Sequence, residues 1–294
     1  KKSSDLHQHD YYSIDKYSKI TFALNDVTDK VFEEGKFKKL PFLKDHVEVC
    51  NETGKLILPL SVDETVTRLI YRKEPKSEKN IILGQRSNGI NDLLNTGDIV
   101  NTMLKDCFTD VDIYNDEVRL LQYPFTSPIS SRTAISFYRY FIVDTLMVDG
   151  KQRCIQVDFT PNNPQDFGFS GSLYIMADGT YRVYKADMGI PVRSDVNFVQ
   201  SMRIIQTFDQ LPTGEQVLVK DNMLVQLHIT KSAGKFQVKR DTEYSNFAFE
   251  PIPDKTFKFK GETLTSANAQ MQDEHFWQEH RADSLTKSES TMKQ

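Results

Sequence analysis

The sequence predicts a mostly β protein of the α+β class, in which a large curved antiparallel sheet, or half-barrel, carries one or two helices on its concave face. Two patterns favour this class. Apolar residues recur at every second position over most of the chain, which is the period of a half-buried strand. These stretches are joined by short turns such as Asp149-Gly150 and Asp178-Gly179, and strands joined by tight turns run antiparallel.

Composition narrows the class of protein. The chain has 294 residues and a formal net charge of −4, enough for one large domain or two small ones. Lys and Arg are scattered, whereas a nucleic-acid surface needs a basic face, so we expect no nucleic-acid partner. The apolar runs are far shorter than the roughly 20 residues of a membrane-spanning helix. The three cysteines are far apart with no C-x-x-C pair, which favours buried structural thiols.

Strands dominate the first third of the chain. Residues 17–24 alternate between polar and apolar, and "HVEVC" and "KLILPL" flank "NETG" as a hairpin would. Residues 65–73 and 79–85 continue as strands. "DVDIY" and "EVRLL" meet at Asn115-Asp116, which predicts another tight turn.

Helices are few. Residues 92–108 form an amphipathic pattern, and residues 29–40 form a weaker one that Gly35 interrupts. Neither would be stable alone in water, so we expect them to pack on the sheet.

From residue 137 the pattern becomes regular. Four hairpins follow one another, and they predict a meander of at least eight strands over residues 137–244. Their turns lie at Asp149-Gly150, Asp178-Gly179, Thr213-Gly214 and Ala233-Gly234.

Both ends are polar. We expect residues 1–10 to be a flexible N-terminus, residues 11–255 to form the half-barrel domain, and residues 256–294 to form a polar connector. Residues 261–294 are rich in Ser, Thr, Gln, Glu and Lys, a composition typical of a poorly ordered tail.

The stretch "DEHFWQEH", residues 273–280, resembles a metal-binding helix at first sight. However, His275 and His280 are five residues apart, which places them about 140° apart around a helix, too far to chelate one ion. "GFSGS" leads into a strand and is no phosphate cradle, and no nucleophile motif is present. The sequence therefore predicts no catalytic residues, no metal and no cofactor, although a carboxylate pair acting on a glycoside stays open as an alternative.

The sheet itself carries the candidate site. In each predicted strand of the meander, large apolar side chains share one face. Such a face is either a plain core, covered by helix 92–108, or an apolar cleft for a lipid or acyl chain. The residues that we assign to this candidate ligand face are Ile155, Val157, Phe159, Leu173, Ile175, Met188, Ile204 and Phe208.

Three long segments carry a family resemblance. Residues 123–130, 137–190 and 197–225 resemble the middle region of a family of bacterial envelope proteins of unknown function. Residues 17–27, 58–76, 111–121 and 276–289 are similar too, so that the resemblance covers most of residues 11–289. In place of an expected proline, Ala282 follows Arg281, a departure that bears only on the rigidity of the connector.

The resemblance implies a context. By this resemblance, a complete member of the family consists of a carboxypeptidase-regulatory-like N-terminal domain, then this region, and then a C-terminal outer-membrane β-barrel. The fold is also similar to LolA/RseB-like half-barrels, which are lipoprotein carriers and related regulator sensors. The implied location is the periplasm, tethered to the outer membrane.

Three functions follow as expectations. The first is a non-enzymatic periplasmic module that binds a lipid or a lipidated protein. The second is a scaffold between the N-terminal domain and the barrel, with Phe276 and Trp277 as partner contacts. The third, an enzyme, has no residues to support it.

Overall fold

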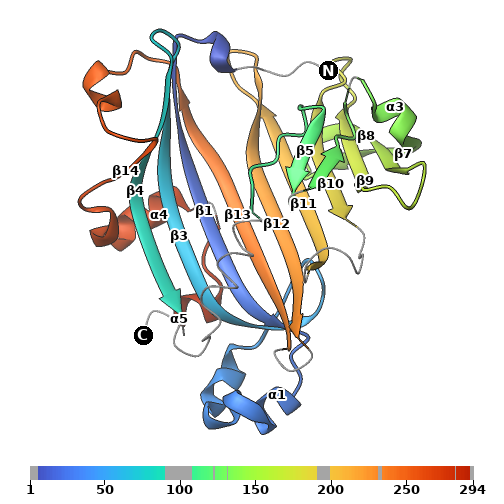
Figure 1. Cartoon of the computed structure of the whole chain (residues 1–294), viewed down its shortest axis with the longest axis vertical. Coiled ribbons are helices and arrows are strands. Elements are labelled where there is room, and N and C mark those ends of the chain that lie inside the picture. The colour runs from blue at the N-terminus through green and yellow to red at the C-terminus, as the bar shows by residue number, and fades with distance from the viewer. Residues whose placement is uncertain are drawn as a thin grey trace. The chain divides into compact units, whose positions relative to one another are not determined.

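The computed structural model describes residues 6–89, 108–121, 123–130, 132–190, 199–230, 234–281 and 283–291. The chain is mostly β, with one large open sheet and few helices, which confirms the predicted fold class (Figure 1). The strand order is β14-β4-β3-β1-β13-β12-β11-β10-β9-β8-β7, with β2 beside β3. Every pair with a known register is antiparallel except β14–β4, which is parallel.

The chain divides into two compact units. The terminal unit comprises residues 7–95 and 226–294, and the middle unit comprises residues 1–6 and 96–225. None of the described helices is both long and apolar enough to span a bilayer.

Long strands form the centre of the terminal unit. They are β1 (Tyr11–Asn25), β3 (Leu56–Arg72), β4 (Ser77–Gly89) and β13 (Gly234–Ala248), with the short β2 (Glu48–Val49) and β14 (Thr263–Thr265) at their margins. The predicted hairpin around "NETG" is confirmed by the pairing of β2 with β3. The two strands predicted over 55–60 and 65–73 form one continuous strand. Pro59 does not interrupt it, because Pro59 lies where the β1–β3 register shifts and few hydrogen bonds between the strands are lost there.

The helix predicted over 29–40 is short and broken. It consists of α1 (Lys30–Glu33) and the 3₁₀ helix η2 (Gly35–Lys39), followed by η3 (Pro41–His46). In Figure 1 these helices lie beyond the end of β1 and not on a sheet face, which corrects our expectation. The helix predicted over 92–108 falls almost wholly outside the described residues.

The C-terminal segment is folded where we expected a loose tail. It contains β14, η6 (Ala269–Met271), α4 (Glu274–His280) and α5 (Lys287–Thr291), after η5 (Asp254–Phe257). Trp277 and Glu289 are both buried. The polar composition did not predict this order, because a few buried side chains fix the segment and the average composition is dominated by their exposed neighbours.

The predicted meander over residues 137–244 has seven described strands, β7 to β13, and not the eight or more that we expected, because the strands predicted on either side of Asp221 form the single strand β12. Most of these strands belong to the middle unit. Its strands are β7 (Tyr138–Val148), β8 (Gln152–Pro161), β9 (Ser170–Met176), β10 (Val183–Ile190), β11 (Val199–Gln210) and β12 (Gln216–Thr230), the last of which crosses into the terminal unit. At the β7–β8 turn, Asp149 and Gly150 have φ of 53° and 65°, as a type I′ hairpin requires.

One predicted hairpin is wrong. Residues 117–120 form β5 (Glu117–Leu120), but β5 pairs with β6 (Tyr123–Thr126) and not with "DVDIY". Asp112 instead accepts a hydrogen bond from the backbone N–H of Tyr114 at 2.8 Å, an Asx-type turn that competes with strand pairing. The short helix α3 (Ala134–Phe137) then leads into β7.

Candidate functional site

Strand registers in the middle unit place the eight predicted residues on one face. Ile155 pairs with Ile175 and Val157 with Leu173 between β8 and β9, and Met188 pairs with Ile204 between β10 and β11. Paired residues of neighbouring strands point to the same side of a sheet. Phe159 lies two positions after Val157 and Phe208 lies four positions after Ile204, so both point to the same side as these residues. All eight residues therefore share one face, which we call the apolar face.

Part of the apolar face is covered. Phe159, Leu173, Met188, Ile204 and Phe208 are all buried. The cover consists of residues 109–121 and 123–130, which include the β5–β6 hairpin. The Gln206 side chain donates to the carbonyl of Val111 at 2.8 Å, and the ring of Tyr114 meets Phe208 edge-on at 5.6 Å. Figure 1 shows β5 in front of the strands of this unit.

The cover is anchored at its far end by two tyrosines of β7. The Tyr138 hydroxyl donates to the carbonyl of Thr126 at 2.5 Å, and the Tyr140 hydroxyl donates to that of Pro128 at 2.7 Å. Burial raises the pKa of Tyr140 to about 12 and raises that of Tyr138 further, so both phenols stay neutral and act as donors.

The other part of the apolar face is open at the edge of the sheet. Ile155, Val157 and Ile175 are only half-buried. In register beside them, β7 contributes Ile142, opposite Val157, and Met147, opposite Arg153. We call Ile142, Met147, Ile155, Val157 and Ile175 the edge patch.

The exposure of the edge patch is unusual for its residue types. The side chain of Ile142 is 79% exposed and that of Met147 is 55% exposed. Scattered exposed apolar residues are normal, but a contiguous apolar patch marks a binding surface. β7 is also the last strand in the sheet order and pairs, among the described strands, only with β8.

One cation and one thiol lie near the edge patch. The exposed Arg153 lies opposite Met147, which places a cation beside the apolar surface. The thiol of Cys154, on β8, faces the opposite side of the sheet among Met176, Tyr184 and Val148. Burial first, and then Asp149 and Asp178, raise its pKa to about 11, so it remains a thiol and not a nucleophile at neutral pH.

Ile142 and Met147 were missed from the sequence. The stretch "YRYFIVDTLMV" has apolar or aromatic residues at eight of its eleven positions, on both faces of the strand, so alternation does not reveal its faces. A register shift between Ile142 and Asp144 then exchanges the faces along the strand. A two-residue turn at Asp149-Gly150 would pair Ile142 with Val157 but Met147 with Gln152, so only the observed register places both residues on the apolar face.

Phe276 and Trp277 lie elsewhere, in the terminal unit. Trp277 is 1% exposed and packs with Tyr17, Val66, Leu83 and Phe276. Trp277 therefore packs within the chain itself, and a contact of Phe276 or Trp277 with a partner protein stays a prediction. His275 lies 3.6 Å from Glu279, whereas the ring of His280 contacts that of Phe276 at 4.3 Å. Within the described part of the chain, no three His, Cys, Asp or Glu side chains gather as a metal site would require.

Comparisons with known proteins complete the description. A family model described as "Family of unknown function (DUF5686)" matches residues 1–247. No curated protein matches the chain.

Solved structures show distant likenesses. The chain is similar to a LolA superfamily protein of Nitrosomonas europaea at 12% identity, covering 84% of this chain and 90% of that one, with a TM-score of 0.23. It is similar to lipovitellin at 8% identity, covering 82% and 26%, with a TM-score of 0.27. It is similar to the MucA/MucB complex of Pseudomonas aeruginosa at 8% identity, covering 81% and 94%, with a TM-score of 0.17. Scores this low carry no argument about function, which therefore rests on the chain's own residues.

Proposed function

Because the chain belongs to the DUF5686 family, whose function is unknown, we propose an activity from its own residues. The protein is a non-enzymatic binding module, and its edge patch takes the acyl chain of a lipid or of a lipidated partner. The observation that carries this function is the apolar face of the middle unit, which is covered over β10 and β11 and open at the edge patch.

The edge patch fits an acyl chain for two reasons. It offers branched aliphatic side chains and one methionine on a single side of paired strands, and this mostly apolar surface is interrupted only by Thr145, which lies opposite Ile155. Arg153 stands beside it and supports an amphiphile with an anionic head group, since a guanidinium pairs well with carboxylate or phosphate.

The first test is native mass spectrometry of the purified protein, followed by organic extraction and lipid analysis. A co-purified lipid, or a mass gain on adding a fatty acid, is the expected result. The second test is titration with a fluorescent fatty acid. Ile142→Glu places a charge in the patch and should weaken binding at least about tenfold.

Phe141→Glu is the matched control for that titration. Phe141 is exposed on the same strand but pairs with Asp158, on the opposite face from Val157. Its affinity should equal that of the wild type. Equal affinities for all three proteins would contradict the proposed site, and an absence of any lipid binding would contradict the function.

A second function is favoured by β7 being an edge strand. An edge strand of this length, Tyr138–Val148, offers backbone groups to a strand of a partner protein. The module would then be a scaffold that docks a protein, such as its own flanking domains. If native mass spectrometry gives only the mass of the protein without ligand, and this mass does not increase when lipids are added, the result would favour this function over lipid binding.

The proposal includes a compartment. Following the resemblance to envelope proteins, the module works in the periplasm, tethered to the outer membrane in the full-length protein, between an N-terminal domain and a barrel. Cell fractionation with antibodies against the module tests this location. Recovery in the cytoplasmic fraction would contradict it.

A further inference from the structure

The C-terminal segment, residues 262–291, is buried at only a few points. Its buried described residues are Ala269, Trp277, Ser288 and Glu289. Exposed residues separate them, so the segment has no core of its own. This spacing of single anchors is typical of a bound peptide and not of a domain.

The first anchor is aromatic. Trp277 fills a site formed by Tyr17 and Val66, with Phe276 beside it. Phe276 in turn lies on Gly84, which is opposite Val66 in the β3–β4 register. A Cβ at Gly84 would come within 2.4 Å of the Phe276 ring, so the strand needs glycine for this close approach.

The second anchor is cationic. Glu64 of β3 is 0% exposed and accepts hydrogen bonds from Tyr17 at 2.9 Å and from Arg86 at 2.6 Å. Arg281 completes the set with two bonds to the same carboxylate, one of them 2.7 Å long. Glu274 at the start of α4 binds both arginines, so the two carboxylates balance the two guanidinium groups.

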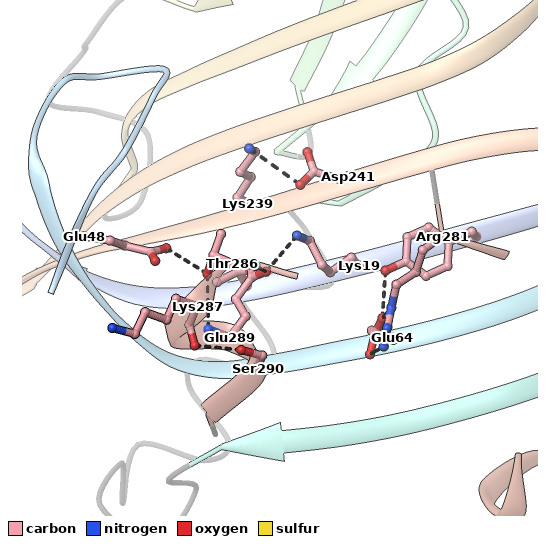
Figure 2. Close-up of polar contacts among 12 residues, drawn as sticks. Lys19, Glu48, Glu64, Lys239, Asp241, Arg281, Thr286, Lys287, Glu289 and Ser290 are labelled. Carbon is pink, nitrogen blue, oxygen red and sulfur yellow. Dashed lines mark hydrogen bonds and ion pairs between the residues drawn. The ribbon is translucent and has the colours of Figure 1, made fainter. Parts of the chain in front are cut away.

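The third anchor is anionic. The carboxylate of Glu289 lies 3.1 Å from the Lys19 ammonium group (Figure 2). It also accepts a hydrogen bond from the Thr21 hydroxyl at 3.0 Å, and both partners belong to β1. The same carboxylate accepts from the backbone of Thr286 at 2.9 Å, and the Thr286 hydroxyl accepts from the backbone of Glu289 at 3.1 Å. This reciprocal capping box holds α5 in the shape that presents the anchor.

Backbone pairing joins the three anchors. β14 adds to the edge of β4 in parallel, with Leu264 opposite Ile81, and the Gln272 side chain donates to the carbonyl of Leu83 at 2.7 Å. Addition of a strand to a sheet edge is a common mode of peptide binding. The connecting residues Lys260 and Gly261 are exposed, and the whole segment follows residue 247, where the family match ends.

We propose that the face of β1, β3 and β4 that carries Tyr17, Lys19, Thr21, Glu64 and Val66 is a peptide-recognition surface. Its ligand is the C-terminal segment, bound in cis and exchangeable with the same segment of a second copy. The surface recognises three side chains: the aromatic Trp277, Arg281 four residues later, and Glu289 in a capped helical turn. This inference does not depend on lipid binding, because it concerns the terminal unit alone.

The test uses the full chain with a site-specific protease site inserted between Lys260 and Gly261. After cleavage, circular dichroism should be unchanged and the two pieces should coelute on gel filtration, because the anchors hold them. A fluorescein-labelled synthetic peptide of residues 261–294 should then bind the cut protein, as measured by anisotropy. It should bind uncut protein at least about tenfold less well, because the tethered segment competes at high effective concentration.

Peptide variants assign the anchors without altering the protein. In competition against the labelled peptide, Trp277→Ala, Arg281→Ala and Glu289→Gln should each raise the required concentration at least tenfold. His275→Ala, at an exposed position of α4, is the matched control and should compete like the wild-type peptide.

Three results would overturn the proposal. Unfolding on cleavage would make the segment an integral part of the fold. A cut piece that stays bound but never exchanges with added peptide would exclude an exchangeable ligand. Equal competition by all four peptide variants would exclude the three anchors.

Discussion

At the residue scale, two adjacent isoleucines in β11 have opposite environments. Ile204 pairs with Met188 and is fully buried, whereas Ile205 pairs with Asp187 and is half-buried. Alternation along the strand predicts this difference from sequence. The same pair therefore offers a direct check of the register.

We expect Ile204→Asp to unfold the protein or to lower its stability by several kcal/mol, because it buries an unpaired charge. Ile205→Asp, on the opposite face, should cost much less. Thermal melting followed by circular dichroism measures both. If the two variants melted together, or if Ile204→Asp melted like the wild type, the strand would be shifted by one residue.

A second residue prediction concerns acid stability. Burial alone would raise the pKa of Asp15, but hydrogen bonds from Arg68 and Asn246 and the charge of Arg68 outweigh it and hold the pKa below the usual value. The stabilisation is therefore present above the unfolded pKa of about 4 and is lost as pH falls through the lower folded pKa.

Asp15→Asn should remove part of this dependence, so that its loss of melting temperature below about pH 4 is shallower than that of the wild type. Asp10→Asn alters an exposed carboxylate and serves as the control. Parallel curves for the wild type and Asp15→Asn would show that Asp15 does not contribute.

Residue faces could be predicted from sequence only where strands are regular. The alternation of β10 places Tyr184 on the same face as Met188, yet Tyr184 packs with Cys154 and Met176 on the other side. The reason is a register shift between Val183 and Lys185. A bulge depends on the partner strand, which the local pattern does not contain.

At the element scale, helix α4 is set by both local and tertiary causes. Locally, Asp273 caps its N-terminus by accepting from the backbone of Phe276 at 2.9 Å. Seven residues (Glu274–His280) are too few for a stable isolated helix. Its stability comes from Trp277, which is the only tryptophan in the chain and so reports α4 docking by fluorescence.

Gly84→Ala tests that docking. The new methyl group would push the ring of Phe276 away from β4, with a cost of about 1–3 kcal/mol, and the emission of Trp277 should shift to the red as water reaches it. Gly189→Ala is the matched control, since its Cβ meets neighbours only at ordinary distances of 3.7–3.8 Å. An unshifted spectrum for Gly84→Ala would mean that α4 does not depend on this contact.

At the scale of the whole molecule, β1 pairs with a strand that lies more than 200 residues later in the sequence. β1 pairs with β3 on one side and with β13 on the other, so Tyr17 lies between Val66 and Glu243. Contacts so distant in sequence make folding slow, because chain entropy is lost before they form.

A chain that ends at Thr230 lacks β13 and should therefore fail to melt cooperatively. A chain that ends at Gly261 keeps β13 and should melt as one transition, at a lower temperature than the full chain. Differential scanning calorimetry measures both. A cooperative transition in the shorter chain would show that β1 does not need β13.

The sequence by itself determined the fold class, the hairpins of the meander and the eight residues of the apolar face, because period two and turn chemistry are local properties. Tertiary structure alone decided which part of that face is covered, that Ile142 and Met147 extend it, and that the polar C-terminal segment is folded. Each of these depends on partners far apart in sequence: residues 109–130 over β10 and β11, β7 against β8, and Arg281 and Glu289 against β3 and β1. Burial and charge pairing across such distances leave no periodic trace in the chain.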